Sequence, residues 1–305
     1  MTFIVRKLSK DDGEMVYPIR QEAYRQNKGA SSLIDKIDKD RMKVQLALVN
    51  RGSNMVIGYS LLWEQVTSPL IHRLEIQLHP DYKIVELLNM LYQSTTQGLS
   101  EIDSKAIQTR LLESQTYELE YFIKQGFLED HRMEKVYLDL QDKSLNIHEH
   151  AQPNISITTL AKEKRVDGHY NEKLKELNER TWFDFPREAL LPPMPPNDNW
   201  LHYENNIEEA FFIAKDGNQF IGYSHLCTFS DTSKKLLQGN TAVLGEFRGK
   251  GVATALKIEG IQYAQANGYE GIFTSHRNTN IPMNTVNEKL GWKRYVSEVR
   301  LQKLL

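Results

Sequence analysis

Apolar and polar residues follow two different periods along this chain, and the two periods alternate from one end to the other. Short runs with period two, bounded by turn residues, predict strands, while apolar residues spaced three and four apart predict helices. A clear example is the pair of runs at 210–214 and 220–226, which flank Asp216 and Gly217. Asp-Gly between two apolar runs is a strong hairpin signal. Interleaved strands and helices of this kind predict a mixed α/β fold.

The other expected elements follow the same order. In the second half we expect strands at 155–159, 237–244, 272–275 and 295–301, and helices at 173–182, around 187–190, at 251–266 and shortly after Pro282. In the first half the clearest elements are a strand at 74–78 and a helix at 85–99.

The two halves of the chain resemble each other. Segment 54–62 recurs as segment 218–226, an offset of 218 − 54 = 164, and Gly126-Phe127 recurs as Gly291-Trp292, an offset of 291 − 126 = 165. Two anchors at nearly one offset indicate a duplication. The polar stretch 141–153 has no sustained period and reads as a linker. The sequence therefore predicts two related domains, at 1–145 and 154–305.

Composition narrows the possible partners. The chain has 305 residues, enough for two domains, and its 38 Lys and Arg against 40 Asp and Glu give a net charge of −2. Scattered, balanced charge argues against nucleic acid or an anionic membrane as the main partner. The single Cys227 excludes an internal disulfide and a Cys-x-x-Cys site, and we expect it to be a packing residue. With no run near about 20 apolar residues and no signal peptide, we expect a cytoplasmic protein; the oligomeric state stays open.

The strongest chemical signal lies in segment 241–256, where an apolar strand enters a Gly-x-Gly turn that opens into a helix. Glycines at 249 and 251 leave the backbone open to a ligand, and the N–H groups of a helix's first turn attract anions. Arg248 and Lys250 add positive charge. These features predict a phosphate or pyrophosphate site, although a tight charged turn would show the same two glycines. The spacing fits neither a P-loop nor a Rossmann turn.

Two motifs together make the signal specific. Arg-Gly-Lys-Gly-Val-Ala-Thr-Ala-Leu at 248–256 is followed by Asn-x-x-Met-x-x-x-Asn-x-x-Leu-Gly-Trp at 280–292. This pair resembles the acetyl-CoA-binding motif and the following segment of GNAT N-acetyltransferases. The resemblance implies an α+β GNAT fold, here as two tandem mixed-sheet GNAT-like domains. It also implies cofactor contacts from Ala242, Val243, Leu244, Arg248, Gly249, Lys250, Gly251, Val252, Ala253, Thr254 and Asn280.

The reaction that the resemblance implies is direct attack of an amine on the thioester of acetyl-CoA, with no metal and no covalent enzyme intermediate. A backbone N–H of Val243 or Leu244 is the expected oxyanion donor. GNAT enzymes often carry a proton-donating Tyr four residues before the Gly of the terminal Gly-Phe, and this chain has Asn287 there. An amide cannot give up a proton near neutral pH. The expected acceptor is a primary amine of a small molecule or peptide, and a non-catalytic acyl-CoA sensor or partner-binding module is the alternative.

The general base is open at this stage. Glu246 follows the cofactor strand and His276 ends the next strand, so both are candidates, with His225 on the hairpin as a third. A solvated loop carboxylate and a surface histidine explain the first two equally well.

The first half has lost the Gly-x-Gly turn. With the offset of 165, Ile84 and Glu86 stand where the second half has Gly249 and Gly251. A branched side chain and a negative charge both oppose a pyrophosphate. We therefore expect a degenerate GNAT-like domain that binds no acetyl-CoA and serves as structure or as a wall of the acceptor cleft.

An insertion distinguishes the second half. Leu8 matches Leu160 with an offset of 160 − 8 = 152, so the second half has gained 164 − 152 = 12 residues before its hairpin. This interval contains the proline-rich segment 191–196. Consecutive prolines favour a stiff extended segment. It is hypothesised to line the acceptor pocket, and a loop that docks the two domains is the equal alternative.

Overall fold

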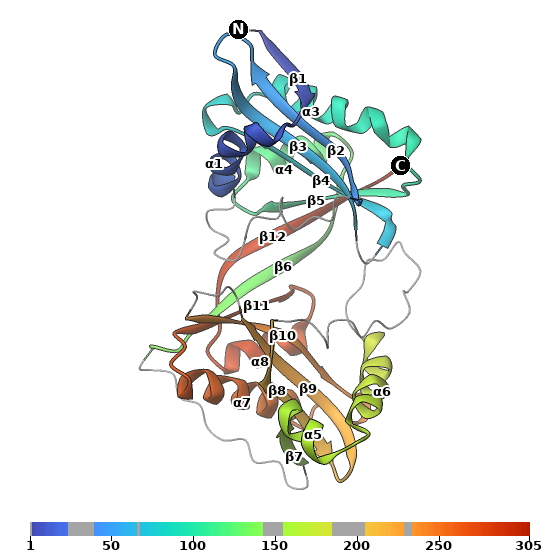
Figure 1. Ribbon diagram of the computed structural model, residues 1–305, viewed down its shortest axis with the longest axis vertical. Coiled ribbons are helices and arrows are strands. Elements are labelled where there is room, and N and C mark those ends of the chain that lie inside the picture. Colours follow the sequence, from blue (N-terminus) through green and yellow to red (C-terminus); the bar gives the residue numbers. More distant parts are fainter. Residues whose placement is uncertain (1, 24–39, 66–67, 143–154, 185–204, 229–233) are drawn as a thin grey trace. The chain divides into compact units, whose positions relative to one another are not determined.

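The computed structural model describes residues 2–23, 40–65, 68–142, 155–184, 205–228 and 234–305 (Figure 1). By packing, the chain forms two compact units. Unit 1 comprises Met1–Met133 and Val296–Leu305, and unit 2 comprises Glu134–Tyr295. The predicted helix around 187–190, the proline-rich segment and most of the predicted linker lie outside the described residues.

Unit 2 contains one sheet with helices on both faces. Its strand order is β7-β8-β9-β10-β11-β6, with β10 and β11 parallel and the pairs from β7 to β10 antiparallel. The strands are β7 (Ile155–Thr159), β8 (Asn206–Asp216), β9 (Gln219–Thr228), β10 (Lys235–Val243), β11 (Gly271–Arg277) and the end of β6 (Leu128–Asp139). The helices are α5 (Leu160–Val166), α6 (Tyr170–Trp182), the 3-10 turn η5 (Gly245–Phe247), α7 (Val252–Ala266) and α8 (Ile281–Lys289).

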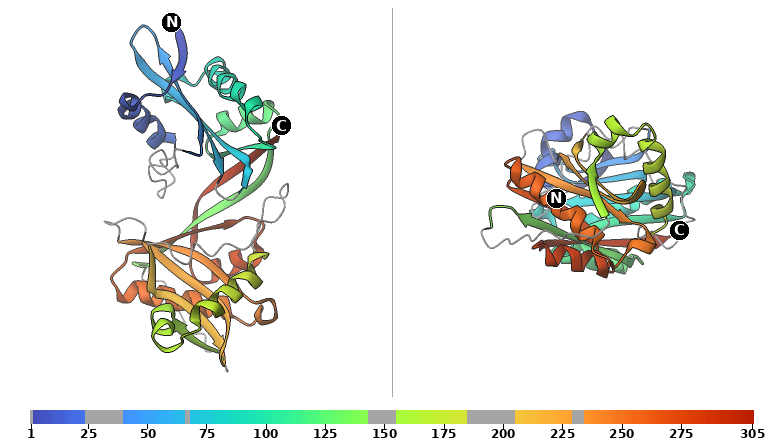
Figure 2. Two further views of the ribbon diagram at one scale, coloured as in Figure 1. Left: turned by 45° about the vertical axis from the view of Figure 1, so that its right-hand side comes forward. Right: turned by 90° about the horizontal axis from the view of Figure 1, so that it is seen from below.

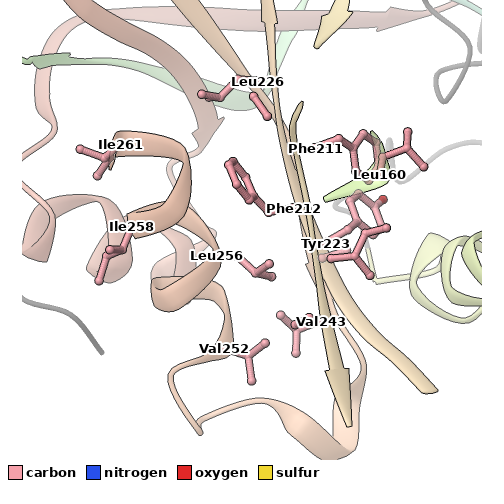
Figure 3. Packing of buried hydrophobic residues seen from close by; sticks show 14 of the residues in the cluster. Leu160, Phe211, Phe212, Tyr223, Leu226, Val243, Val252, Leu256, Ile258 and Ile261 are labelled. Carbon is pink, nitrogen blue, oxygen red and sulfur yellow. The ribbon is translucent and has the colours of Figure 1, made fainter. Parts of the chain in front are cut away.

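Alternation along β8 and β9 builds a core on each face of this sheet. Phe212 points toward the α7 side chains Val252 and Leu256, whereas Phe211 and Tyr223 point to the face that carries α5 (Figure 3). Successive strand residues point to opposite faces, so the apolar runs of these two strands fill both layers. This packing fixes α7 against the sheet and thereby places its N-terminus beside the end of β10.

Unit 1 repeats the same order of elements. Its sheet runs β1-β2-β3-β4-β5-β12. In Figure 2, α1 lies on one face of this sheet and α3 and α4 lie on the other. The strands are β1 (Phe3–Lys7), β2 (Met42–Asn50), β3 (Met55–Gln65), β4 (Ser68–Leu78), β5 (Ala106–Leu112) and most of β12 (Lys293–Leu304). The helices are η1 (Lys10–Asp12), α1 (Gly13–Ala23), η2 (Pro80–Tyr82), α3 (Val85–Thr96), η3 (Gln97–Glu101) and α4 (Thr116–Lys124).

One pair of glycines shows the duplication at atomic detail. A Cβ on Gly58 would lie 2.9 Å from the carbonyl oxygen of Gln77 and 3.3 Å from Leu91 Cδ1. A Cβ on Gly222 would lie 2.9 Å from the carbonyl oxygen of Ala242 and 3.4 Å from Leu256 Cδ1. The same close approach of strand, strand and helix therefore occurs in both units. The equivalent residues differ by 222 − 58 = 164, 242 − 77 = 165 and 256 − 91 = 165, the offsets found in the sequence.

The compact units cut the chain differently from the predicted domains 1–145 and 154–305. The last strand, β12, pairs antiparallel with β5 from Glu298 to Leu304. Its Val299 and Leu301 lie in the core of unit 1, and the red C-terminal strand runs beside the strands of that unit in Figures 1 and 2. In return, Val136 and Leu138 of β6 lie in the core of unit 2. The predicted boundaries remain a prediction of where each sequence repeat begins and ends. In the structure, most of β12 packs in unit 1 and the end of β6 packs in unit 2.

Candidate active site

The strands β10 and β11 part soon after they begin to pair. Their parallel pairing covers only Lys235–Leu237 against Gly271–Phe273, although both strands continue beyond it. A register shift in β10 between Gln238 and Thr241 accompanies the separation. The Thr274 hydroxyl donates to the Gln238 carbonyl oxygen at 3.2 Å, just past the last paired residues. Beyond this point the facing edges of both strands carry backbone groups that are not used in a β10–β11 ladder.

The hydrogen bonding of β10 decides which of its N–H groups can meet a ligand. The Leu244 N–H donates to the Ile221 carbonyl oxygen at 2.9 Å, so Leu244 is wrong as an oxyanion donor. Hydrogen-bonded and non-hydrogen-bonded pairs alternate along an antiparallel ladder. Val243, which lies opposite Gly222, therefore directs its N–H and C=O away from β9, toward the edge that β11 has left. Of the two predicted donors, the geometry supports Val243.

The Gly-x-Gly turn has the conformation that an anion site needs. Gly249 and Gly251 have φ values of 72° and 81°, in the left-handed region, and a Cβ on Gly249 would meet nothing within 4 Å. No side chain of the described residues caps α7, and its first intrahelical bond runs from the Ala255 N–H to the Gly251 carbonyl oxygen. The N–H groups of Val252, Ala253 and Thr254 consequently point out of the helix end without an intrahelical acceptor. Together with the helix dipole they favour a bound phosphate.

The two basic side chains of the turn have different surroundings. Arg248 donates from Nε to the Val243 carbonyl oxygen at 3.0 Å and forms an ion pair with Asp184. Its guanidinium therefore ties the turn to the end of β10, and the carboxylate partly offsets its charge. Lys250 is exposed, with Nζ 5.0 Å from the centre of the Phe247 ring. The positive potential at the turn therefore comes from the backbone N–H groups and Lys250 more than from Arg248.

Glu246 is held by a cation. Its carboxylate lies 2.5 Å from the Arg180 guanidinium and is about half exposed. Its own backbone N–H and Arg180 hold the pKa of Glu246 below its usual range. A carboxylate with a lowered pKa is a weaker base, so the environment gives little support to Glu246 as the general base.

The structure brings His276 and Asn287 together. Nδ1 of His276 lies 3.2 Å from Nδ2 of Asn287, and Nε2 of His276 lies 3.1 Å from Oδ1 of Asn284. The Asn287 amide nitrogen can only donate, so this contact makes Nδ1 an acceptor and leaves the proton on Nε2. Burial lowers the pKa of His276, opposed by the contact with Asn284. His276 is therefore a buried neutral imidazole that faces α8, and the surface-histidine interpretation is wrong.

Three other residues that the sequence singles out are held in structural contacts or in the core. His225 is buried and stacked on Phe211 with ring centres 5.1 Å apart, and burial lowers its pKa to about 4. Cys227 is buried as expected, and burial raises the pKa of its thiol to about 11. The Asn280 side chain accepts from the Met283 N–H at 3.3 Å and so caps α8 at the parted end of β11. Asn280 remains a predicted cofactor contact.

Sequence reasoning missed Lys257. This lysine lies on α7 with 1 % of its surface exposed, and its Nζ is 4.6 Å from the centre of the Trp292 ring. A signal was present, because Lys257 stands between Leu256 and Ile258 on a helix whose inward positions are otherwise apolar. Burial lowers the pKa of Lys257 to about 7. A lysine on a buried helical face is rare enough to mark a position for closer study.

In the corresponding region of unit 1, a glutamine side chain connects the two strands. The Gln115 side chain accepts from the Leu112 N–H at 2.8 Å and donates to Gln77 Oε1 at 3.3 Å, so it links β5 to β4. Gln115 corresponds to Asn280, since 280 − 115 = 165. The helix α3 begins after Ile84, an extended residue, and carries Glu86 in its first turn. A cavity of about 300 Å³ remains beside Gln77 and Gln115, but this helix start lacks the glycine turn and carries a negative charge.

The described residues contain no group of three or more His, Cys, Asp or Glu side chains that could hold a metal ion. Over the same ranges, no helix is long and apolar enough to cross a membrane.

Comparison with known proteins agrees with this geometry. Residues 173–292 match the model of the acetyltransferase (GNAT) family. The second half of the chain carries a GNAT domain. The match includes the parted strands, the Gly-x-Gly turn and the α8 segment, all in unit 2. No curated protein sequence matches the chain.

Solved structures show the same fold over nearly the whole length. A GCN5-related N-acetyltransferase from Sphaerobacter thermophilus superposes with a TM-score of 0.73 at 16% identity, covering 99% of this chain and 95% of its own. A tandem GNAT protein from the clavulanic acid biosynthesis pathway gives a TM-score of 0.69 at 16% identity, covering 99% and 98%. At such identity the likeness shows the fold. Together with the family match over residues 173–292, it shows a tandem GNAT architecture whose second half contains the segment that matches the acetyltransferase family.

Proposed function

We propose that unit 2 transfers an acetyl group from acetyl-CoA to a primary amine of a small molecule or peptide. The observation that carries this proposal is the N-terminus of α7, which no side chain of the described residues caps, with Gly249 and Gly251 in the left-handed region, beside the edge of β10 at Val243 that β11 has left. A helix end with outward N–H groups suits a pyrophosphate, and a free strand edge suits an extended amide-containing arm. Acetyl-CoA has both parts.

Each group of the site has a role in this proposal. The N–H groups of Val252, Ala253 and Thr254 hold the pyrophosphate, and Lys250 adds charge. The bound thioester supplies an activated acetyl group. The Val243 N–H then stabilises the oxyanion that forms when the amine attacks, because a fixed donor in a water-poor site favours developing negative charge. Buried Ala242 and Val243 exclude water from the arm.

Unit 1 is proposed to bind no acetyl-CoA. Glu86 places a negative charge at its helix start, and the Gln115 link occupies the strand edges that the arm would need. One acetyl-CoA per chain is therefore expected.

An acyl-CoA sensor that catalyses nothing is the second candidate. It is favoured by Asn287, a buried amide at the position where GNAT enzymes often carry a proton donor. A sensor would bind acetyl-CoA without releasing free CoA thiol in the presence of any amine.

Calorimetric titration with acetyl-CoA tests the binding site. The wild-type chain should bind one equivalent, and Gly251→Glu should abolish binding. Gly268→Glu is the matched control, because Gly268 lies past the other end of α7, has a φ of 74° and has open space around its Cβ position. Equal loss of binding in both variants, or two equivalent sites in the wild type, would contradict the proposal.

A further inference from the structure

Four side chains form a buried polar cluster between α7, β11 and α8. They are Lys257, His276, Asn287 and Trp292, each at most 5 % exposed. Contacts join them in two pairs: Lys257 Nζ lies over the Trp292 ring, and Asn287 Nδ2 contacts His276 Nδ1. Among the described residues, two buried atoms of this cluster have no hydrogen-bond partner, Oδ1 of Asn287 and Nε1 of Trp292. One is an acceptor and the other a donor. Unsatisfied buried polar atoms are costly, so a native fold that keeps them calls for an explanation.

Unit 1 supplies an internal comparison. With the offset of 165, the four positions correspond to Tyr92, Leu111, Phe122 and Phe127, which all belong to the apolar core of unit 1.

The backbone confirms these equivalences. The Phe127 N–H donates to the Phe122 carbonyl oxygen at 3.1 Å, and the Trp292 N–H donates to the Asn287 carbonyl oxygen at 3.0 Å. The glycine before each aromatic residue has a positive φ, 85° in unit 1 and 89° in unit 2. The two sites thus have the same frame. The fold is therefore compatible with apolar side chains at these four positions. In unit 2, which also has the proposed anion-binding turn, three of these positions carry Lys257, His276 and Asn287.

The cluster lies on the same elements as the place where a thioester is expected. His276 lies on the part of β11 that has separated from β10, and Asn287 and Asn284 bind its ring from α8. Lys257 lies on α7, the helix whose first turn is the proposed pyrophosphate site. The cluster is consequently bounded by the same helix and strand that bound the proposed acetyl-CoA site.

We propose that this cluster protonates the thiolate that leaves acetyl-CoA, with Lys257 as the proton donor, the Trp292 Nε1–H as the group that donates to the thiolate, and Asn287 Oδ1 as the acceptor for the thiol once it has formed. This inference rests on the proposed function. When the bond between the acyl carbon and sulfur breaks, its electron pair stays on sulfur. A proton passes from the Lys257 ammonium to that sulfur and leaves a neutral amine. The proton that the acceptor nitrogen loses on attack restores the ammonium through solvent, so no other reactant is consumed.

Lys257 suits this role better than His276. The His276 ring accepts at Nδ1 from Asn287 and holds its one proton on Nε2 against Asn284, so it is neutral and committed to α8. Burial places the pKa of Lys257 near neutrality, where an amine can both give and regain a proton. Outside the cluster, the charged groups that act on His276 are Glu134 on β6 and Glu288 on α8.

Lys257→Met tests the proposal, because methionine keeps the length and apolar stem and removes the amine. We expect kcat for CoA thiol release to fall about 100-fold or more, the scale of general acid catalysis, while the acetyl-CoA Kd changes less than about twofold. The matched control is Lys289→Met, an exposed lysine on α8, which should keep wild-type kcat. In the wild type, kcat should fall as the pH rises above about 7, as the ammonium is lost. The residual activity of Lys257→Met should lack that limb.

The outcomes separate this inference from the proposed function. Unchanged kcat in Lys257→Met, with an active wild type, overturns the role of Lys257 alone. Equal losses of kcat and acetyl-CoA affinity, with a lowered Tm, show a structural residue and also overturn it. An inactive wild type that binds acetyl-CoA overturns both the transferase activity and this inference.

Discussion

Lys257→Met should change how the stability of the protein depends on pH. The pKa of Lys257 is lowered from 10.5 to about 7 by burial, so between these values the unfolded chain holds a proton that the folded chain does not. Stability therefore rises with pH across this window, because the unfolded state binds more protons there. Below about pH 7 both states are charged, and the folded wild type bears the full cost of a buried ammonium. The methionine variant lacks the whole effect.

The size of the effect follows from the same two pKa values. For one group with these pKa values, the contribution of Lys257 raises the free energy of unfolding of the wild type by about 3 kcal/mol from about pH 6.5 to about pH 9.5. The other titrating groups are common to both proteins and cancel in the difference. Urea unfolding of wild type and Lys257→Met at both pH values measures it, with Lys289→Met as the control that should match the wild type. If the change in unfolding free energy between the two pH values differs by less than about 0.5 kcal/mol between wild type and Lys257→Met, the reasoning that an unpaired amine is buried here is refuted.

Three further sets of substitutions test the structure. Asn287→Ala should lower kcat modestly and Asn287→Tyr should be tolerated, since the amide oxygen only orients the thiol and gives no proton; a complete loss of activity in the alanine variant with unchanged acetyl-CoA affinity would show a larger role. Gly58→Ala and Gly222→Ala should each cost about 1–3 kcal/mol by overpacking, measured by urea unfolding, and only Gly222→Ala should also weaken acetyl-CoA binding, because it displaces β10. Gln115→Ala should lower the stability of unit 1 without adding a second acetyl-CoA site in calorimetry; two sites would show that the Gln115 link alone had closed it.

Much of the fold was predictable because local patterns control it. The helix expected at 251–266 is α7, and the hairpin at 210–226 is β8 and β9, since Asp216 and Gly217 determine the turn and the period does the rest. The short helix α5 was missed, although Thr159 begins it with a hydroxyl that accepts from the Lys162 N–H at 3.2 Å. Such a cap is visible in sequence when the helix is long enough to show a period.

The features that could not be predicted depend on contacts between distant residues. The exchange of β12 into unit 1 rests on pairing with β5, almost two hundred positions earlier, and apolar alternation does not identify a partner strand. The ion pair of Glu246 with Arg180 likewise joins residues far apart, and it weakens a base that looked free in sequence. The sequence shows a lysine at position 257, but its burial depends on the packing of α7 against Trp292, which the sequence does not show.

The central claim is that unit 2 catalyses acetyl transfer, and release of free CoA thiol from acetyl-CoA across a broad panel of amines tests it most directly. The wild type should release thiol with at least one amine and in equal amount to the acetylated amine, Gly268→Glu should do the same, and Gly251→Glu should release none. Binding of acetyl-CoA by the wild type with no amine-dependent thiol release across the panel would contradict the claim and identify a sensor instead.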